Sequence, residues 1–223
     1  MAFHLVGINN QNFIMQDEET SSWWQQVTGQ ATFGQLKGKQ LKSVHHDEIT
    51  FGVWKKEQPN GRVLKPSTNY KSQYASDDWE TKIAKLPLVT QVDPNDVLQP
   101  RSIVLGITIS DVSKAYPLEE LEKQKVIMDK IGEIPIIIVM GEDKKSIRVF
   151  EARIEGKELE MFVKTNSTPL CLIDNQTATH WDFTGKGVSG SMAGKQLKKV
   201  YVLKDYWFDW KLYHPQTKLY QLG

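Results

Sequence analysis

Apolar residues along this chain are grouped mainly in short runs with the length of β-strands. Runs rich in β-branched and aromatic residues predict strands at 13–15, 103–109, 134–140, 146–154 and 159–163. The tripeptide Glu155-Gly156-Lys157 separates the last two runs and predicts a hairpin turn. The pattern therefore indicates a mainly β protein.

Helical patterns are few and short. Residues 117–124 begin with proline and have acidic residues early and Lys123 late, which suits the first turn and the dipole of a helix. A second helix is expected after Asp205, placed as its N-cap, with Trp207 and Trp210 on one face. The same aromatic spacing, again followed by a proline, occurs earlier in the chain at Phe51, Trp54 and Pro59.

One stretch of the sequence occurs twice. Thr28–Leu64 aligns with Thr184–Tyr220 without a gap, and 12 of 37 positions are identical, where unrelated sequences would share about two. Glycines recur at four- or five-residue intervals in both copies, which favours tight turns with positive φ rather than a helix. We infer a duplicated module.

The duplication predicts the organisation of the chain. We expect an α+β, mainly β fold with two related β-rich units, each carrying one short helix. Residues 1–66 form the back half of a repeat unit, 67–100 a linker, and 101–223 a second, more complete unit. The first copy has about 27 residues before its glycine motif and the second about 80, so the first is expected to lack its front half.

A half-unit leaves strand edges and an apolar face without a covering layer. The polar, proline-containing linker is long enough for the first copy to dock back on the second, which is the expectation we favour. Self-association through the same incomplete first copy is the second expectation.

Composition excludes several classes of protein. The 223 residues carry a net charge of +1, which provides no global field for binding nucleic acid. No apolar run approaches the roughly 18 residues needed to cross a bilayer. Cys171 stands alone, so neither an internal disulfide nor a thiolate metal cluster is expected. No export signal is visible in this sequence, and localisation stays open.

Several of these motifs resemble an uncharacterised family of prokaryotic proteins, domain of unknown function 3179. Its members carry an aspartate, a tryptophan, the motif T-G-x-A-x-x-G-x-L-x-G-x-x-L and a later W-x-x-x-x-P. The family's front half contains A-Y-P-L and then I-G-x-x-P. The corresponding residues here are Asp17, Trp24, 28–41, Trp54 with Pro59, 115–118 and 131–135.

The resemblance implies a modular fold and no particular activity. Members often look exported, which makes export of the full-length protein an expectation from the family alone. Typical members carry a cysteine-containing stretch where this chain has Val139–Asp143. No thiol or metal role is therefore expected there.

A run of potential metal ligands, His45-His46-Asp47-Glu48, lies between the glycine motif and the first short helix. Adjacent side chains of a strand point to opposite faces, so at most two of them would share one ion. The second copy has no ligands at the equivalent positions, 201–204. We interpret the run as a solvated loop, and expect no metal site and no cofactor.

Tryptophans are the best indication of a binding site. Trp24 and Trp181 precede the glycine turns and lie near an aspartate in each copy, and such aromatic platforms hold sugars or other flat polar ligands in many β-rich modules. Packing of these indoles in the core is the stronger interpretation. The candidate ligand-binding residues are Asp17, Trp24, Thr28, Gly29, Asp174, Trp181, Thr184 and Gly185.

Repetition without a repeated reactive group favours a non-catalytic binding or structural module whose ligand is unknown, a small molecule or a glycan. One alternative is an enzyme with a site at the junction of the units, built from Asp174, His180 and Cys171. The other alternative is a carbohydrate-binding module that uses Trp24 or Trp181.

Overall fold

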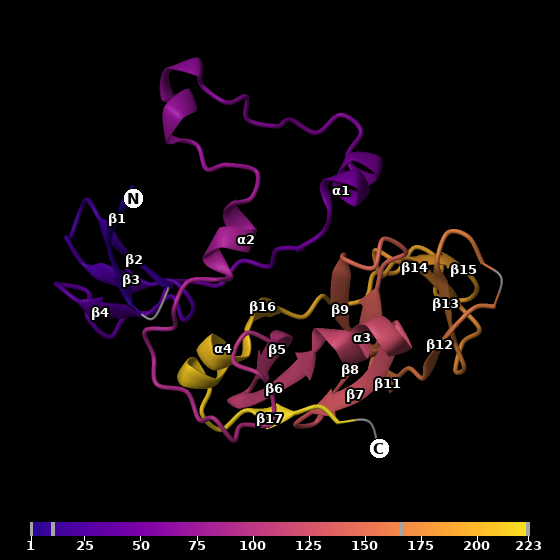
Figure 1. Ribbon diagram of the computed structural model, residues 1–223. Coiled ribbons are helices and arrows are strands. Elements are labelled where there is room, and N and C mark those ends of the chain that lie inside the picture. Colours follow the sequence, from indigo (N-terminus) through magenta and orange to yellow (C-terminus); the bar gives the residue numbers. More distant parts are fainter. Residues whose placement is uncertain (1, 10–11, 166, 222–223) are drawn as a thin grey trace. The chain divides into compact units, whose positions relative to one another are not determined.

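The computed structural model describes residues 2–9, 12–165 and 167–221. It confirms the expected fold class, which is α+β and mainly β with few short helices. The chain forms two compact units (Figure 1). Unit 1 comprises Met1–Val44 and Arg62–Arg101, and unit 2 comprises His45–Gly61 and Ser102–Gly223. The boundaries expected from the repeat, at residues 66 and 100, mark which segments are related in sequence, and they remain a prediction.

In unit 1 the described residues form an antiparallel sheet with the strand order β1-β2-β3-β4. A register shift between Leu5 and Gly7 interrupts the first pairing. Residues 62–101 add only a short 3₁₀ helix, η1, and one turn of α-helix, α2, in agreement with their polar, proline-containing sequence. The bounds are β1 Phe3–Asn9, β2 Asn12–Asp17, β3 Trp23–Gln25, β4 Ala31–Phe33, η1 Thr68–Gln73 and α2 Trp79–Ile83.

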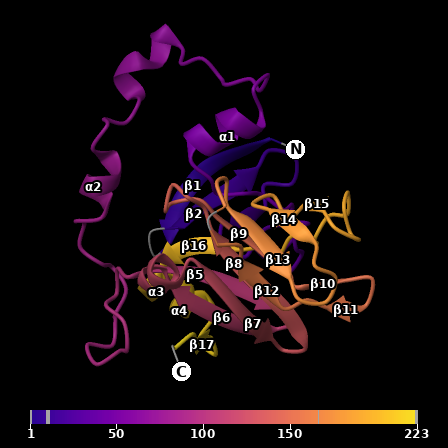
Figure 2. The same ribbon diagram turned by 90° about the vertical axis from the view of Figure 1, so that its right-hand side faces the viewer.

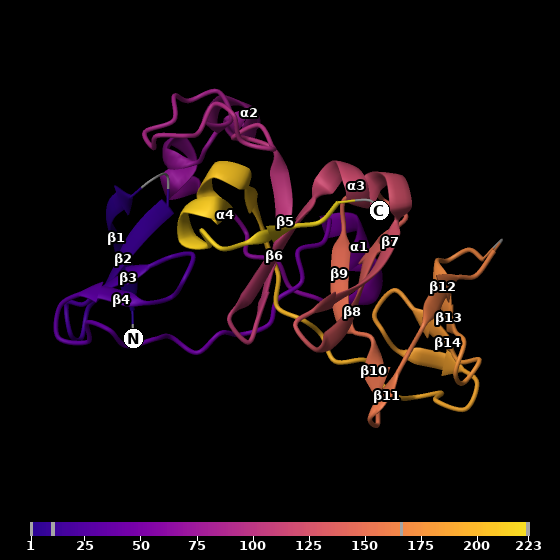
Figure 3. The ribbon, with the colours of Figure 1, turned by 90° about the horizontal axis from the view of Figure 1, so that it is seen from below.

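The described residues of unit 2 form three sheets and one small hairpin, and the three-stranded sheet lies between the two four-stranded ones (Figure 3). The first sheet has the order β16 (Leu203–Tyr206), β5 (Ile103–Ile109), β6 (Val112–Pro117) and β17 (Lys218–Leu219). The middle sheet consists of β7 (Val126–Ile131), β8 (Ile134–Met140) and β9 (Ile147–Glu151).

The third sheet of unit 2 lies against the β8–β9 side of the middle sheet (Figure 2). It has the order β12 (Met161–Val163), β13 (Cys171–Asp174), β14 (His180–Asp182) and β15 (Gly187–Ser189). Strands β10 (Arg153–Ile154) and β11 (Lys157–Glu158) form the hairpin that the sequence predicts around Gly156.

Strand β8 is apolar throughout because both of its faces are covered. Ile136 and Ile138 pack with residues of the first sheet and of helix α3 (Leu118–Gln124) in one hydrophobic cluster. Ile137 and Val139 point the other way and pack with Leu172 and Trp181 of the third sheet in a second cluster. The middle sheet is therefore the shared core layer of unit 2.

Two further helices have the positions that the aromatic spacing predicts, α1 (Phe51–Glu57) and α4 (Trp207–Tyr213). The N-cap of α1 is Thr50, whose side chain accepts a hydrogen bond from the Val53 amide. The prediction that Asp205 caps α4 is wrong. The cap residue is Tyr206, which makes no side-chain cap hydrogen bond, and the Asp205 carboxylate accepts from the amide of that residue. In the described residues no helix is long and apolar enough to span a membrane.

The two copies of the glycine motif have the same local geometry. Strands β2, β3 and β4 follow one another as β13, β14 and β15 do, and each set has a register shift just before the aligned tryptophan. The glycines have positive φ at all six equivalent positions, 29, 34 and 38 in the first copy and 185, 190 and 194 in the second.

Two of these glycines provide a matched pair for a stability test. Gly190 has φ +95°, and a Cβ there would lie 2.6 Å from the Thr179 Cα, whereas Gly194 has φ +84° and open space. We expect Gly194→Ala to cost about 1 kcal/mol for the left-handed backbone alone, and Gly190→Ala about 2 kcal/mol because backbone must also move. Chemical denaturation measures both, and equal losses would contradict the assigned close approach.

Candidate functional site

The aspartates and tryptophans expected in a ligand site bond to each other. The Asp174 carboxylate accepts hydrogen bonds from the amide of Thr177 and, at 2.9 Å, from the Trp181 indole. Asp17 and Trp24 make the same bond at 2.8 Å in the first copy. The two indoles are only 0% and 4% exposed, so neither presents an open ring face. These four residues fix a tight turn in each copy.

The hydrogen bonds of this turn favour the charged form of Asp174. Burial by itself would raise the pKa of Asp174, but hydrogen bonds from Thr177 and Trp181 dominate and lower it. The charged carboxylate therefore stabilises the turn between β13 and β14.

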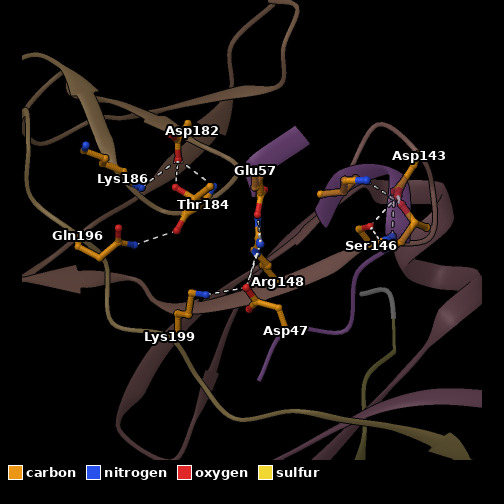
Figure 4. A network of polar contacts seen from close by, with 12 residues as sticks. Asp47, Glu57, Asp143, Ser146, Arg148, Asp182, Thr184, Lys186, Gln196 and Lys199 are labelled. Atoms are coloured by element: carbon orange, nitrogen blue, oxygen red, sulfur yellow. Dashed lines mark hydrogen bonds and ion pairs between the residues drawn. The ribbon is translucent and has the colours of Figure 1, made fainter. Parts of the chain in front are cut away.

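The candidate threonines and glycines are also bonded within their own turns. Thr184 donates to the Asp182 carboxylate at 2.6 Å, and its carbonyl accepts from the Gln196 side chain at 2.8 Å (Figure 4). The Thr28 carbonyl accepts from Gln40 in the same way. A Cβ at Gly185 would lie 2.5 Å from the Phe150 ring, so glycine permits close packing there. At the equivalent Gly29, the side chains closest to such a Cβ are Gln40 and Leu41, at 3.2 and 3.5 Å, and neither is aromatic.

The structure does not bring together the three residues of the enzyme alternative. On β13 and β14, Cys171 pairs with Asp182 and Ile173 with His180, so the thiol and the imidazole occupy the same half-exposed face at diagonal positions. Asp174 alternates to the opposite, buried face. The thiol contacts the Leu172 carbonyl at 3.4 Å, and in the described residues no hydrogen bond joins it to His180.

A different group of charged residues converges in unit 2, around Arg148 on β9 (Figure 4). Its guanidinium donates two hydrogen bonds of 2.7 Å to the Glu57 carboxylate and bonds of 2.9 and 3.0 Å to one oxygen of Asp47. Lys199 donates to that same oxygen at 2.7 Å. The guanidinium carbon lies 4.8 Å from the centre of the Phe183 ring. The Arg148 side chain is only 3% exposed.

Both carboxylates on Arg148 come from a segment of the first copy, residues 45–61, which we call the strap. The chain on either side of the strap belongs to unit 1. Glu48 forms an isolated β-bridge with Ile147, the first residue of β9, and ion-pairs with Lys204 at 3.2 Å. Helix α1 has no buried residue. Polar contacts rather than an apolar face therefore hold the strap in unit 2.

The start of α1 is attached to the turn between β8 and β9. Thr50 donates from its hydroxyl to the Asp143 carboxylate at 2.6 Å and from its amide to the Ser146 hydroxyl at 2.9 Å. Ser146 in turn donates to Asp143 at 2.6 Å (Figure 4). Burial raises the pKa of Asp143, but the hydrogen bonds from Ser146 and Thr50 outweigh it and lower that pKa to about 2.

The charges at Arg148 support one another. Burial disfavours charge on both partners, yet hydrogen bonds from Lys199, Arg148 and His45 lower the pKa of Asp47 to about 2. Burial acts to lower the pKa of Arg148, and the carboxylates of Glu57 and Asp47 raise it. A forked guanidinium in this setting is a site for carboxylates or other flat anions.

Sequence reasoning missed this site. The interpretation of residues 45–48 as a solvated loop is wrong for Asp47, whose side chain is 18% exposed and bound to Arg148. His46 packs its ring against Tyr201. In the described residues no three His, Cys, Asp or Glu side chains are grouped to hold a metal. The signal available was the arginine itself, because a charge in a strand of buried residues needs a partner.

Together, the repeated turns and the strap define a mainly β modular protein with an internal ion-pair site. The comparison with family models identifies the particular family: residues 3–217 match the model described as "Protein of unknown function (DUF3179)". The chain belongs to this family, as its motifs indicated. Neither the curated proteins nor the solved structures gave a match.

Proposed function

We propose that the protein is a non-catalytic binding and structural module in which unit 2 binds an acidic strand-and-helix segment. The observation that carries this proposal is the nearly complete burial of Arg148 beneath Asp47 and Glu57. A buried guanidinium is costly unless carboxylates satisfy it, so the site has a built-in requirement for an acidic occupant. The strap is that occupant in this chain.

Support also comes from the kinds of residue involved. The repeated turns are occupied with their own hydrogen bonds, and the buried indoles provide no surface for a sugar. Arg148 and Lys199 instead offer a forked donor and an ammonium group to carboxylates. A role in holding modules together accounts for both features.

Self-association through the first copy remains part of the proposal. Strand β1 is an edge of its sheet, and Phe3, Leu5 and Ile8 on it are 40%, 50% and 64% exposed. Exposed apolar side chains on an edge strand favour pairing with another chain. Light scattering over a range of concentrations measures this association.

The strap test uses Asp47→Asn with Glu57→Gln in the full chain. Loss of both carboxylate charges is expected to speed amide hydrogen exchange across 45–61 by about tenfold or more, since even a modest ion-pair loss of about 1.4 kcal/mol has that effect. Exchange in the β5–β9 strands should stay slow. Mass spectrometry of peptic fragments gives the readout.

Glu155→Gln is the matched control, because Glu155 forms an exposed ion pair with Lys195 away from the strap. It should leave exchange across 45–61 unchanged. Unchanged strap exchange in the double variant would contradict the proposal. Acid gives an independent check: Asp47 has a lowered pKa, so its contribution is present above about pH 4 and is lost as the pH falls towards 2.

A further inference from the structure

A cavity of about 260 Å³ lies in unit 2 beside the turn between β8 and β9, apart from the Arg148 site. Its apolar wall includes Met140 at the end of β8, Val163 at the end of β12, and Leu170 just before β13. Three lysines line it as well, and each comes from a different segment: Lys125, Lys144 and Lys164. Glu142 is the acidic residue of the lining.

Two of these lysines have an unfavourable backbone conformation. Lys125 ends helix α3 with φ 62°, at a position where helices usually have glycine or asparagine. Lys144 has φ 56° in the turn after β8. They are the two lysines with positive φ among the described residues, and both line this cavity. Strained residues of this kind occur preferentially at ligand-binding positions.

The turn that carries Lys144 is held firmly. The Asp143 carboxylate accepts from the amides of Lys145 and Ser146 at 3.1 and 2.9 Å, and the Lys144 amide donates to the Gly141 carbonyl at 3.0 Å. Lys125 is fixed in a similar way, because its amide donates to Leu121 and its carbonyl accepts from Met140. The backbone therefore presents these lysines in a preorganised arrangement.

The lysines at the cavity lack anionic partners. Across residues 2–9, 12–165 and 167–221, ion pairs involve other lysines, such as Lys130 with Glu158 and Lys198 with Glu151, and none involves Lys125, Lys144 or Lys164. The cavity has an apolar wall and is bordered by three exposed lysine side chains that form no ion pair among the described residues, which matches a ligand with an aliphatic part and a negative charge.

We propose that this cavity binds a small aliphatic carboxylate. At roughly 30 Å³ per small group, the space holds about eight or nine non-hydrogen atoms, which is the size of hexanoate. The chain packs on Met140, Val163 and Leu170, and the carboxylate lies among the three ammonium groups. No residue of the strap lines the cavity, so hexanoate binding and the strap test are measured separately and either can fail without the other.

Isothermal titration of the full-length protein with hexanoate tests the proposal. For a ligand of this size we expect a dissociation constant of about 1 mM. Hexanamide has the same shape without the charge and should bind about tenfold more weakly, and hexylamine should not bind. Higher salt should weaken hexanoate and leave hexanamide unaffected. Equal binding of hexanoate and hexanamide, or no binding of either, overturns the proposal.

Variants locate the site. The triple change Lys125→Gln, Lys144→Gln and Lys164→Gln should weaken hexanoate binding about tenfold or more, while Lys157→Gln, an exposed lysine outside the cavity, should leave it unchanged. Val163→Trp fills the cavity from a side chain that is 44% exposed, and should abolish binding without loss of the fold.

Lys144→Gly separates binding from folding. Glycine adopts φ 56° without strain, so this variant should keep or raise the thermal midpoint and still bind hexanoate more weakly. If all these variants bind hexanoate as the original chain does, the cavity is not the site and the proposal fails.

Discussion

Replacing Arg148 by methionine is expected to destabilise the protein by about 3 kcal/mol and to release the strap. The guanidinium is the common partner of Asp47 and Glu57. Without it, two partly buried carboxylates lie close together, and only Asp47 keeps a cation, Lys199. Methionine has a similar length and tolerates the apolar neighbour Phe183, so the loss reports the missing charge rather than a cavity. Denaturant unfolding gives the free energy.

Arg153→Met is the comparison, since Arg153 ion-pairs with Glu151 while its side chain is 42% exposed. Exposed pairs contribute about 0–1 kcal/mol, so this change should have a small effect. Similar losses for the two variants would show that Arg148 is not a buried organising charge. Hydrogen exchange should also remain slow across the strap in Arg153→Met and become fast in Arg148→Met.

The second large effect is a loss of stability with rising pH that depends on Asp205. Burial and, next to it, the charge of Asp209 raise the pKa of Asp205 from 3.8 to about 7. The folded protein therefore holds a proton that the unfolded chain releases near pH 4. Between about pH 4 and pH 7 the folded state binds more protons, so stability falls as the pH rises, by about 3 kcal/mol in total.

Asp205→Asn removes this titration. The variant should be more stable than the original chain at pH 8, where the original carries the buried charge, and should show little difference at pH 4. Asp111→Asn, an exposed position that has φ 67° and suits asparagine, is the control and should keep the original pH dependence. The prediction fails if Asp205→Asn has the same slope of stability against pH between 4 and 7.

Local sequence signals identified the long buried strands and three of the short helices, because those signals have local causes. Strands β5 and β8 occupy the predicted residues, 103–109 and 134–140, since apolar β-branched runs of this length suit buried strands. The glycine positions correctly indicated positive φ in both copies. Strand β7 was missed because Val126–Ile131 contains the adjacent polar residues Asp129 and Lys130 and so has no long apolar run.

The candidate site was harder to predict because its contacts are not local. Asp174 and Trp181 lie seven residues apart and were correctly placed near each other, but their hydrogen bond made them part of the turn. Arg148 and Asp47 are 101 residues apart, and no spacing rule relates them. A short polar run such as His45 to Asp47 has the same sequence whether its side chains are bound to water or to a distant arginine.

The strap has a consequence for the order in which the chain folds. Its ion pairs close loops of 91 and 101 residues, whereas the turns between β13 and β14 close over a few residues. Closing a long loop costs more chain entropy, and that cost must be met before the ion pairs contribute. The strap contacts are therefore expected to form after the folding transition state. They are therefore expected to affect the rate of unfolding, and so the lifetime of the folded protein, rather than the rate of folding.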